Sequence, residues 1–232
     1  MPSPTRPYDL VTFDCYGTLI DWEAGMSAAL ERLGRELGVA VDARGMVRRY
    51  IQLELGLEQS SYRRYRDILR LGLAALFKER GTTLSASASR AFVRSMAEWK
   101  PFPETATTLR RLRAAGYRTA VLSNVDDSLL ARSLKLIGVP FDYKITAQSV
   151  RSYKPCVRHW EKLLTVSGVP KRRVLHVAAS LVHDIIPAKT LGFNCVWINR
   201  NGERPMPGTA PRQVFRDLKG LLPLLPTRPI SQ

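Results

Sequence analysis

The sequence predicts an α/β fold, with a doubly wound, mostly parallel sheet and a helical segment inserted after the first strand. From Glu104 onward, short apolar runs of strand length alternate with stretches of helical periodicity. Such alternation favours right-handed crossovers and a parallel sheet that carries helices on both faces. Between Asp21 and Lys100 the sequence has helical patterns and no convincing strand, so this part is predicted to be a helical insert.

The first strand is predicted at Leu10–Phe13, a short apolar run without a breaker residue. Asp14 follows it directly, and a carboxylate at the end of a core strand points to a use, because burying an unpaired charge is costly. Gly17 then allows the backbone to approach a ligand closely. In open α/β sheets ligands bind beyond the carboxyl ends of the strands. The same spacing also fits a strand that simply ends in a turn.

Apolar spacing predicts four helices in the insert, at residues 24–37, 44–57, 62–78 and 87–99. Gly38 is expected to end the first of them, and Ser85 or Ser87 is expected to cap the last. The predicted division is a core of residues 1–20 and 103–232 and a helical cap of residues 21–102. A helical block placed directly after the first strand is suited to covering the crevice at the end of that strand.

Within the core, strands are predicted at residues 117–123, 143–147, 174–178 and 194–198, and helices at residues 105–115, 128–137, 155–167, 185–191 and 214–222. Gly138, Gly168 and Gly192 stand where three of these helices are expected to end. Asp126 and Asp127 are predicted to cap the helix that starts near residue 128.

Polar residues stand where the predicted strands stop. Ser123 and Asn124 follow the second strand, and their hydroxyl and amide groups can hold a carboxylate or phosphate oxygen. Lys154 precedes a proline, and an ammonium beside Asp14 would hold that carboxylate ionised. Asp184 follows the fourth strand. Each residue also has a plain structural explanation, as a helix cap or as a solvated lysine.

The segment FDCYGTLID at the end of the first strand resembles the first motif of the haloacid dehalogenase superfamily. Its members attack their substrate with the first aspartate of this motif. Tyr16 at the second motif position is similar to the 2-haloacid dehalogenase branch, whereas the phosphatase branch has an aspartate there. The Ser123-Asn124 pair, the segment YKP that contains Lys154, and Asp184 resemble the remaining motifs and follow in the same order. The resemblance implies a Rossmann-like core with a helical cap.

The resemblance further implies hydrolysis of short (S)-2-haloacids to 2-hydroxy acids through an ester on an aspartate. The catalytic residues would then be Asp14 as nucleophile, Thr18 to orient it, and Lys154 and Asp184 to handle charge and water. The predicted substrate-binding residues are Cys15, Tyr16, Ser123, Asn124, Arg49, Ser180 and His183. Of these, backbone amides near Tyr16 would hold the substrate carboxylate, and the thiol of Cys15 is expected to pack in the core.

Some positions depart from the family pattern. Arg49 resembles the halide-binding arginine of the dehalogenases, but the match is loose, and Arg48 is the alternative. Leu181 stands where characterised dehalogenases have an asparagine that helps to place the hydrolytic water, and Trp160 stands where they have a tyrosine. His183 is therefore a candidate to assist the water, or else a wall residue of the pocket.

The identity of residue 16 separates two reaction classes. A phosphate ester leaves as an alkoxide and gains about 10²- to 10⁴-fold from a proton donor, and Tyr16, with a reference pKa of about 10, replaces such a donor poorly. A halide needs no proton, so dehalogenation without a cofactor or metal is the first hypothesis. The alternatives are a phosphatase that binds Mg²⁺ through Asp14, the Tyr16 carbonyl and Asp184, displacement of another leaving group such as ring opening of a small strained amino acid, and a non-catalytic protein of this fold.

Composition limits the partners. The formal net charge is +16 over 232 residues, yet the basic residues are mostly dispersed singly, so a small anionic substrate is expected rather than nucleic acid. The sequence contains no run of about 18 apolar residues, so no membrane span is predicted. The three cysteines lack a metal or redox spacing, which is typical of reduced thiols in a cytoplasmic protein. A homodimer is implied only by the family resemblance.

Overall fold

A computed structural model describes residues 6–225 of the chain. Its centre is a six-stranded sheet in the order β3-β2-β1-β4-β5-β6, and every neighbouring pair is parallel. The strands are β1 (Leu10–Phe13), β2 (Arg118–Ser123), β3 (Tyr143–Thr146), β4 (Val174–Ala178), β5 (Asn194–Ile198) and β6 (Gln213–Phe215). The chain winds outward in both directions from β1, so the strand order reverses between β1 and β4. A ligand site is expected at this switch point, beyond the carboxyl ends of the two strands.

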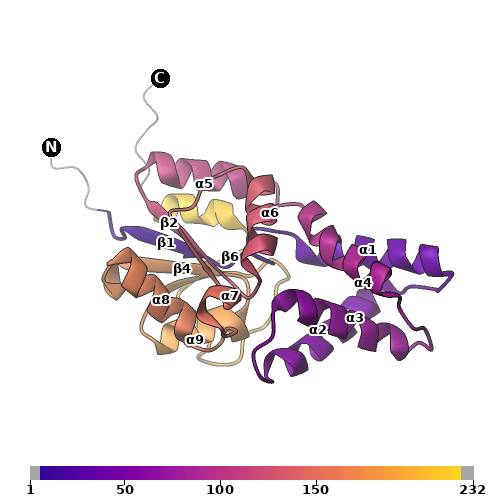
Figure 1. Cartoon of the computed structure of the whole chain (residues 1–232). Coiled ribbons are helices and arrows are strands. Elements are labelled where there is room, and N and C mark those ends of the chain that lie inside the picture. The colour runs from indigo at the N-terminus through magenta and orange to yellow at the C-terminus, as the bar shows by residue number, and fades with distance from the viewer. Residues whose placement is uncertain (1–5, 226–232) are drawn as a thin grey trace.

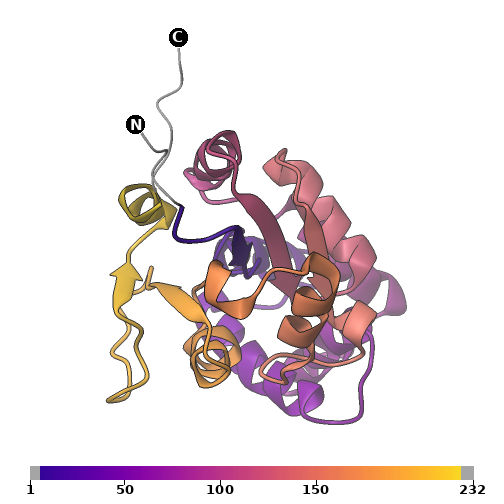
Figure 2. The same cartoon turned by 90° about the vertical axis from the view of Figure 1, so that its left-hand side faces the viewer.

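Helices cover both faces of the sheet (Figures 1 and 2). Val11 and Phe13 of β1 belong to one hydrophobic cluster, and Leu10 belongs to the other, as the alternation of side chains along a strand requires. The first face carries α5 (Thr105–Ala114), α6 (Asp127–Ile137), η4 (Leu218–Gly220) and α10 (Leu221–Leu224), and the second carries α8 (Arg158–Ser167) and α9 (Ile186–Thr190). The predicted doubly wound α/β class is confirmed.

The segment between β1 and α5 is helical, as predicted, and lies beyond the carboxyl ends of the strands (Figure 1). It consists of α1 (Trp22–Leu37), α2 (Ala43–Glu58), α3 (Tyr65–Lys78), α4 (Ala86–Ser95) and the short 3₁₀ helix η1 (Met96–Glu98). Asp21 caps α1, and Gly38 ends it with a φ of +66°, which glycine adopts without strain. Of the two predicted caps for α4, Ser85 accepts the N–H of Ala88.

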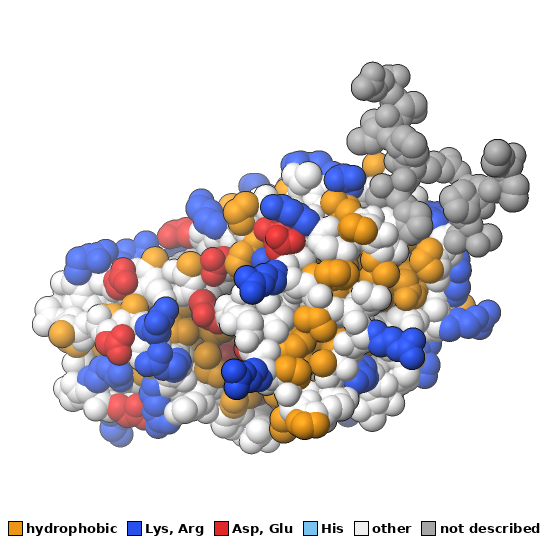
Figure 3. All heavy atoms as spheres, turned by 180° about the vertical axis from the view of Figure 1, so that it is seen from behind, with side chains coloured by type: hydrophobic (Ala, Val, Ile, Leu, Met, Phe, Trp, Pro, Cys, Tyr) orange, Lys and Arg blue, Asp and Glu red, His pale blue; other side chains and the backbone are white. Residues whose placement is uncertain are grey.

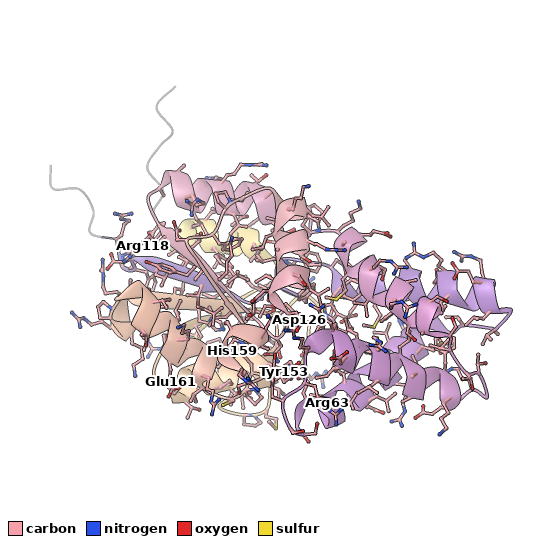
Figure 4. The ribbon with its side chains drawn as sticks, in the orientation of Figure 1. Arg63, Arg118, Asp126, Tyr153, His159 and Glu161 are labelled. Carbon is pink, nitrogen blue, oxygen red and sulfur yellow. The ribbon has the colours of Figure 1, made fainter. Side chains whose placement is uncertain are left out.

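Asp126 joins this helical block to the core rather than capping its own helix. Its side chain makes no capping hydrogen bond in α6. Instead, the fully buried carboxylate accepts the backbone N–H groups of Tyr65 at 3.0 Å and Arg66 at 3.2 Å, at the start of α3. Because α3 has no side-chain cap of its own, Asp126 supplies the acceptor that its free N–H groups need. Nearby, the hydroxyl of Tyr153 donates to the carbonyl of Arg63 at 2.8 Å (Figure 4).

Two predicted helices differ in the structure. The prediction of a helix at residues 214–222 is wrong, because Val214 pairs with Trp197 and extends the sheet as β6. The short helices η4 and α10 follow this strand. The helix predicted at residues 185–191 begins as a π-helix, η3 (Leu181–Ile185), before α9. Ser180, and not Asp184, is its N-cap, and its hydroxyl accepts the N–H of His183 at 3.1 Å.

Smaller differences lie in the connections. The helix expected from residue 155 starts at Arg158, and two short helices were not predicted, α7 (Ala147–Val150) and η2 (Lys171–Arg173). Within residues 6–225, no helix has both the length and the apolar character needed to cross a bilayer. On the face in Figure 3, Lys and Arg side chains lie dispersed among uncharged ones instead of forming one continuous patch.

Candidate active site

Asp14 lies directly beyond β1, at the switch point of the sheet, and is 8% exposed. Its Oδ2 accepts the hydroxyl of Thr18 at 2.8 Å, and its Oδ1 accepts the ammonium of Lys154 at 2.8 Å. Thr18 is itself held by the N–H of Ala179, which donates to Oγ1 at 2.9 Å. Burial raises the pKa of Asp14, and the neighbouring Lys154 opposes this rise. The carboxylate therefore has a fixed orientation at the end of the strand.

Lys154 connects two carboxylates. Its Nζ donates to Asp14 Oδ1 at 2.8 Å, to Asp184 Oδ1 at 2.7 Å and to the carbonyl of Leu122 at 2.9 Å. An ammonium has three N–H groups, so all of its donors are engaged. Burial alone would lower the pKa of Lys154, but the two carboxylates outweigh burial and raise it. Lys154 is thus a permanent cation that is 1% exposed and has no donor left for a ligand.

Asp184 lies within the π-helix and receives two donors on the same oxygen. Besides Lys154, the Nε2 of His176 lies 3.1 Å from Oδ1. Burial alone would raise the pKa of Asp184, but Lys154 and His176 together lower it. The carboxylate is therefore ionised at neutral pH and able to accept a proton.

A cavity of about 600 Å³ opens above Asp14 and is lined by the core and by residues of the helical block, among them several on α2. Glu54 and Glu58 of α2 lie in its wall. Burial raises the pKa of Glu54 to about 7, and burial and the neighbouring Glu54 raise the pKa of Glu58 to about 9. The hydroxyl of Tyr65 donates to Glu54 Oε1 at 2.6 Å, and the nearest cationic candidate to Glu58 is His183 Nε2 at 3.8 Å. The carboxyl group of Glu58 therefore holds its proton at neutral pH, whereas the pKa of Glu54 lies close to neutral.

The structure corrects the prediction for Arg49. Its guanidinium makes a two-pronged contact with Glu79, including an Nη2–Oε1 distance of 2.6 Å, on the outer surface of the helical block. Arg49 does not line the cavity, and neither does the alternative, Arg48, which is exposed. The reason is helical phase, because Val47, Tyr50 and Glu54 share the inward face of α2 whereas Arg49 lies on the opposite face.

The remaining predicted binding residues lie close to Asp14 but differ in their contacts. The thiol of Cys15 is fully buried in the core, as expected. The hydroxyl of Tyr16 is 2.8 Å from Ser133 Oγ. Asn124 lines the cavity, but its amide holds the backbone of Lys154, donating to the carbonyl at 3.1 Å and accepting the N–H at 2.7 Å. The buried hydroxyl of Ser123 has no hydrogen-bond partner within residues 6–225.

The segment before Asp184 contributes to the cavity wall. Ser180, Leu181 and His183 all line it, and Ser180 Oγ lies 3.2 Å from His183 Nδ1. Burial lowers the pKa of His183, which favours its neutral form. Trp160 does not line the cavity; it is buried beneath the sheet, edge-on to His176 at a ring distance of 5.5 Å.

Several residues of the site were not predicted. Glu54 and Glu58 are four residues apart on α2, a spacing equally common on a solvated face. Arg200 follows β5 and donates to the carbonyls of Gly17 at 3.2 Å and Thr18 at 2.8 Å, so it fixes the turn after Asp14. His176 interrupts an apolar strand, VLHVA, and this interruption was the one signal that could have identified it.

Comparison with known proteins agrees with this geometry. A model of the family described as haloacid dehalogenase-like hydrolase matches residues 8–192. The chain is a haloacid dehalogenase-like hydrolase. The match extends from the start of β1 through the helical block and α9, and so includes Asp14, Lys154 and Asp184.

Individual relatives of this hydrolase cover nearly the whole chain. An (S)-2-haloacid dehalogenase of Burkholderia cepacia, 4A, is 32% identical over 219 residues, which are 92% of this chain and 93% of the relative. A haloacetate dehalogenase of Moraxella, H-2, is 25% identical over 85% of this chain and 88% of its own. Among solved structures, a dehalogenase with an intermediate complex superposes with a TM-score of 0.84 at 25% identity, covering 96% of this chain and 99% of that one.

Proposed function

We propose that this hydrolase converts short (S)-2-haloacids to 2-hydroxy acids through an ester on Asp14. The observation that carries the proposal is the fixed Asp14 carboxylate at the cavity wall, held by Lys154 and Thr18. The named relatives act on 2-haloacids and haloacetate, which supports this substrate class.

In the first step, an Asp14 oxygen attacks C2 of the substrate. A carbon–oxygen bond forms, and the carbon–halogen bond breaks with its electron pair on the halide, so that C2 is inverted. The N–H groups of Cys15 and Tyr16 make no backbone hydrogen bond within residues 6–225, and we assign the substrate carboxylate to them and to the hydroxyl of Ser123. Because no cap arginine lines the cavity, we assign the departing halide to the protonated carboxyl of Glu58.

In the second step, water attacks the carboxyl carbon of Asp14. Asp184 accepts one proton of the water, and the bond between that carbon and the ester oxygen, which came from Asp14 in the first step, breaks. The proton on Asp184 passes to this oxygen as the 2-hydroxy acid departs, and the second proton of the water leaves Asp14 for solvent, so that the carboxylate is restored. Lys154 stabilises the negative charge that develops on Asp14 Oδ1, because its Nζ is already 2.8 Å from that atom. The chain's own side chains thus supply nucleophile, base and charge stabilisation.

The phosphatase alternative fits these residues less well. A magnesium ion shared by Asp14 and Asp184 would lie beside the Lys154 ammonium, which already contacts Oδ1 of both carboxylates at 2.8 and 2.7 Å, and the two cations would repel each other. Burial also raises the pKa of Tyr16 well above its ordinary value, so this residue is a poor proton donor for an alkoxide. These contacts favour a halide leaving group.

We further propose that α1–α4, within residues 21–102, act as the cap of a core formed by residues 1–20 and 103–232. The contacts of Asp126 with α3 support a defined seat for this cap. A cytoplasmic location is supported by the free thiols of Cys15, Cys156 and Cys195. That the enzyme acts without nucleic acid or membrane partners, and that it forms a homodimer, stay predictions.

Halide release tests the proposed function. Wild-type protein is incubated with chloroacetate and with each enantiomer of 2-chloropropionate, and with p-nitrophenyl phosphate plus Mg²⁺. We expect halide from chloroacetate and the (S) enantiomer, unchanged by a chelator, and loss of at least about 10³-fold in Asp14→Asn. Glu23→Gln, which removes another cavity carboxyl, is the control. Metal-dependent release of phosphate without halide would contradict the proposal, as would full activity of Asp14→Asn.

A further inference from the structure

His176 is a fully buried polar residue in the middle of β4. The parallel register of β1 and β4 places it beside Thr12, and Thr12 Oγ1 lies 2.8 Å from His176 Nδ1. The other ring nitrogen, Nε2, lies 3.1 Å from Asp184 Oδ1. The rings of Trp160 and His176 form a T-shaped pair with their centroids 5.5 Å apart. Both nitrogens of the imidazole therefore have a buried polar neighbour, and the ring packs against Trp160 of α8.

The direction of the hydrogen bonds follows from the acceptor. Asp184 is ionised and can only accept, so His176 Nε2 must carry the hydrogen. In the neutral imidazole Nδ1 is then an acceptor, and the hydroxyl of Thr12 donates to it. Thr12 also has the carbonyl of Leu175 within 3.4 Å, so its hydroxyl keeps an acceptor if the histidine is replaced.

Both donors to Asp184 bind the same oxygen. Lys154 Nζ at 2.7 Å and His176 Nε2 at 3.1 Å share Oδ1, and Oδ2 receives no donor from residues 6–225. A carboxylate turns easily about its last torsion, and a single donor would not fix it. Two donors on one oxygen do, and they leave Oδ2 without a donor among the described residues, on a side chain that lines the cavity.

Other residues of the segment around Asp184 that line the cavity include Ser180, Leu181 and His183. Leu181 has no polar side-chain atom, and Ser180 Oγ and His183 Nδ1 lie 3.2 Å from each other. Asp184 is the one carboxylate in this segment, so its orientation decides where a water can transfer a proton to it.

We propose that His176 is a positioning residue for the hydrolytic half of the reaction, because it fixes Asp184 with Oδ2 free to take a proton from the attacking water. The inference rests on the proposed function, since it concerns hydrolysis of the Asp14 ester. Water loses a proton to Oδ2 as its oxygen bonds to the Asp14 carboxyl carbon, and that proton then goes to the departing 2-hydroxy acid. The first half of the reaction transfers no proton to Asp184, so it does not need His176.

The test separates the two halves in His176→Leu and His176→Gln. Leucine has a similar volume and no donor, whereas glutamine places an N–H near the position of Nε2. Rapid-quench measurements with (S)-2-chloropropionate follow halide, and mass spectrometry of the intact protein follows the ester. For His176→Leu we expect a halide burst close to one per enzyme, accumulation of the ester, and a steady-state rate lowered about 10- to 100-fold, as for other residues that orient a functional ligand. His176→Gln should recover most of the steady-state rate without accumulating ester.

Two further measurements keep the outcome decisive if His176→Leu folds poorly. Thr12→Val leaves the histidine in place. It should also give a halide burst and accumulate ester, but less than His176→Leu does. Nitrogen NMR of the imidazole needs no substrate and should show the hydrogen on Nε2 at neutral pH. The proposal is overturned by the Nδ1–H tautomer, by equal slowing of both halves, or by a His176→Gln variant as slow as His176→Leu. If the wild type releases no halide, the proposed function itself fails, and the role of His176 fails with it. If the wild type turns over but the His176 variants show no halide burst, only the role of His176 is overturned.

Discussion

The two walls of the cavity solve the problem of buried charge in opposite ways. On the core side, Asp14 and Asp184 share the ammonium of Lys154, at 2.8 and 2.7 Å. On the side of the helical block, Glu54 and Glu58 have no such cation, and their pKa values rise to about 7 and about 9. A buried carboxyl group that lacks a cation keeps its proton. The core wall thus presents ionised carboxylates, whereas the α2 wall presents the protonated carboxyl of Glu58 as a neutral hydrogen-bond donor.

This difference suggests a division of roles, in which the core wall supplies the reacting groups and the α2 wall affects which ligands bind. The core groups are fixed by strand ends and by contacts that exist before substrate arrives, so they can serve any leaving group that needs no proton. We expect the groups on α2 to influence what the cavity accepts, because the charges of Glu54 and Glu58 depend on pH. Changes on the core wall should therefore alter both folding and rate, whereas changes on α2 should alter mainly pH dependence.

Among changes to the two walls, Lys154→Met is expected to have the largest effect on stability and rate. It removes the cation but keeps the length of the side chain, so Asp14 and Asp184 would face each other buried and unpaired. Breaking a buried ion pair in this way costs about 3–5 kcal/mol of unfolding free energy. Urea unfolding measures it, and halide release should be lost as well. Lys162→Met, at an exposed position of α8, should change stability by no more than about 0.5 kcal/mol.

A second variant makes the Lys154 result specific. Adding Asp184→Asn to Lys154→Met removes one of the two unpaired charges, so the double variant should be more stable than Lys154→Met alone. If Lys154→Met unfolds at the wild-type urea concentration, the ammonium does not hold the core wall together.

A smaller effect, which depends on pH, is expected from Glu58→Gln. The pKa of Glu58 is about 9 in the folded chain against an ordinary 4.5, so between these values the folded state keeps a proton that the unfolded state loses. The unfolding free energy of the wild type should therefore fall as pH rises from about 5 to 9. Glutamine cannot ionise, so the variant should equal the wild type near pH 4.5 and be more stable at pH 9.

Thermal unfolding across this pH range measures the Glu58 effect, with about 2–4 °C in Tm for each kcal/mol recovered. Glu36→Gln, on the exposed surface of α1, is the matched control and should give no gain at pH 9. A Glu58→Gln curve parallel to that of the wild type would mean that Glu58 is ionised in the folded chain.

The smallest effect is expected from Arg49→Ala. Its guanidinium contacts Glu79 on the outer surface of the helical block, so its loss should leave kcat/KM for (S)-2-chloropropionate and the Tm at wild-type values. Steady-state halide release measures this, with Arg48→Ala beside it. A loss of about tenfold or more in kcat/KM, 1.4 kcal/mol of transition-state stabilisation, would show that Arg49 reaches the cavity during turnover.

The sequence predicted the core side of the site better than the side of the helical block, for a physical reason. Asp14 directly follows a strand of four residues, and a parallel sheet brings the ends of its strands together at one edge. Lys154 and Asp184 lie close to strands β3 and β4 in the same order as the family motifs. Their convergence therefore needed only the topology, which alternating strands and helices already indicate.

On α2, position depends on helical phase as well as on order. The family resemblance assigns Arg49 to the cavity, but the buried positions Met46, Val47 and Tyr50 place Glu54 inward and Arg49 outward. His176 was missed because its role depends on the register between β1 and β4, which no single segment contains. The helix predicted at residues 214–222 includes Val214 and Phe215 of β6, because local periodicity does not reveal their pairing with β5.

The central claim is that the side chain of Asp14 becomes esterified during turnover. It is tested most directly by a single turnover in heavy-oxygen water, with enzyme in excess over (S)-2-chloropropionate, followed by mass spectrometry of the peptide that contains residues 10–20. Attack of water on the Asp14 carboxyl carbon leaves the heavy oxygen in that carboxyl group, so the peptide should gain the label and the first 2-hydroxypropionate released should not. Label in the product and none in the peptide would mean that water attacks the substrate directly, which contradicts the account.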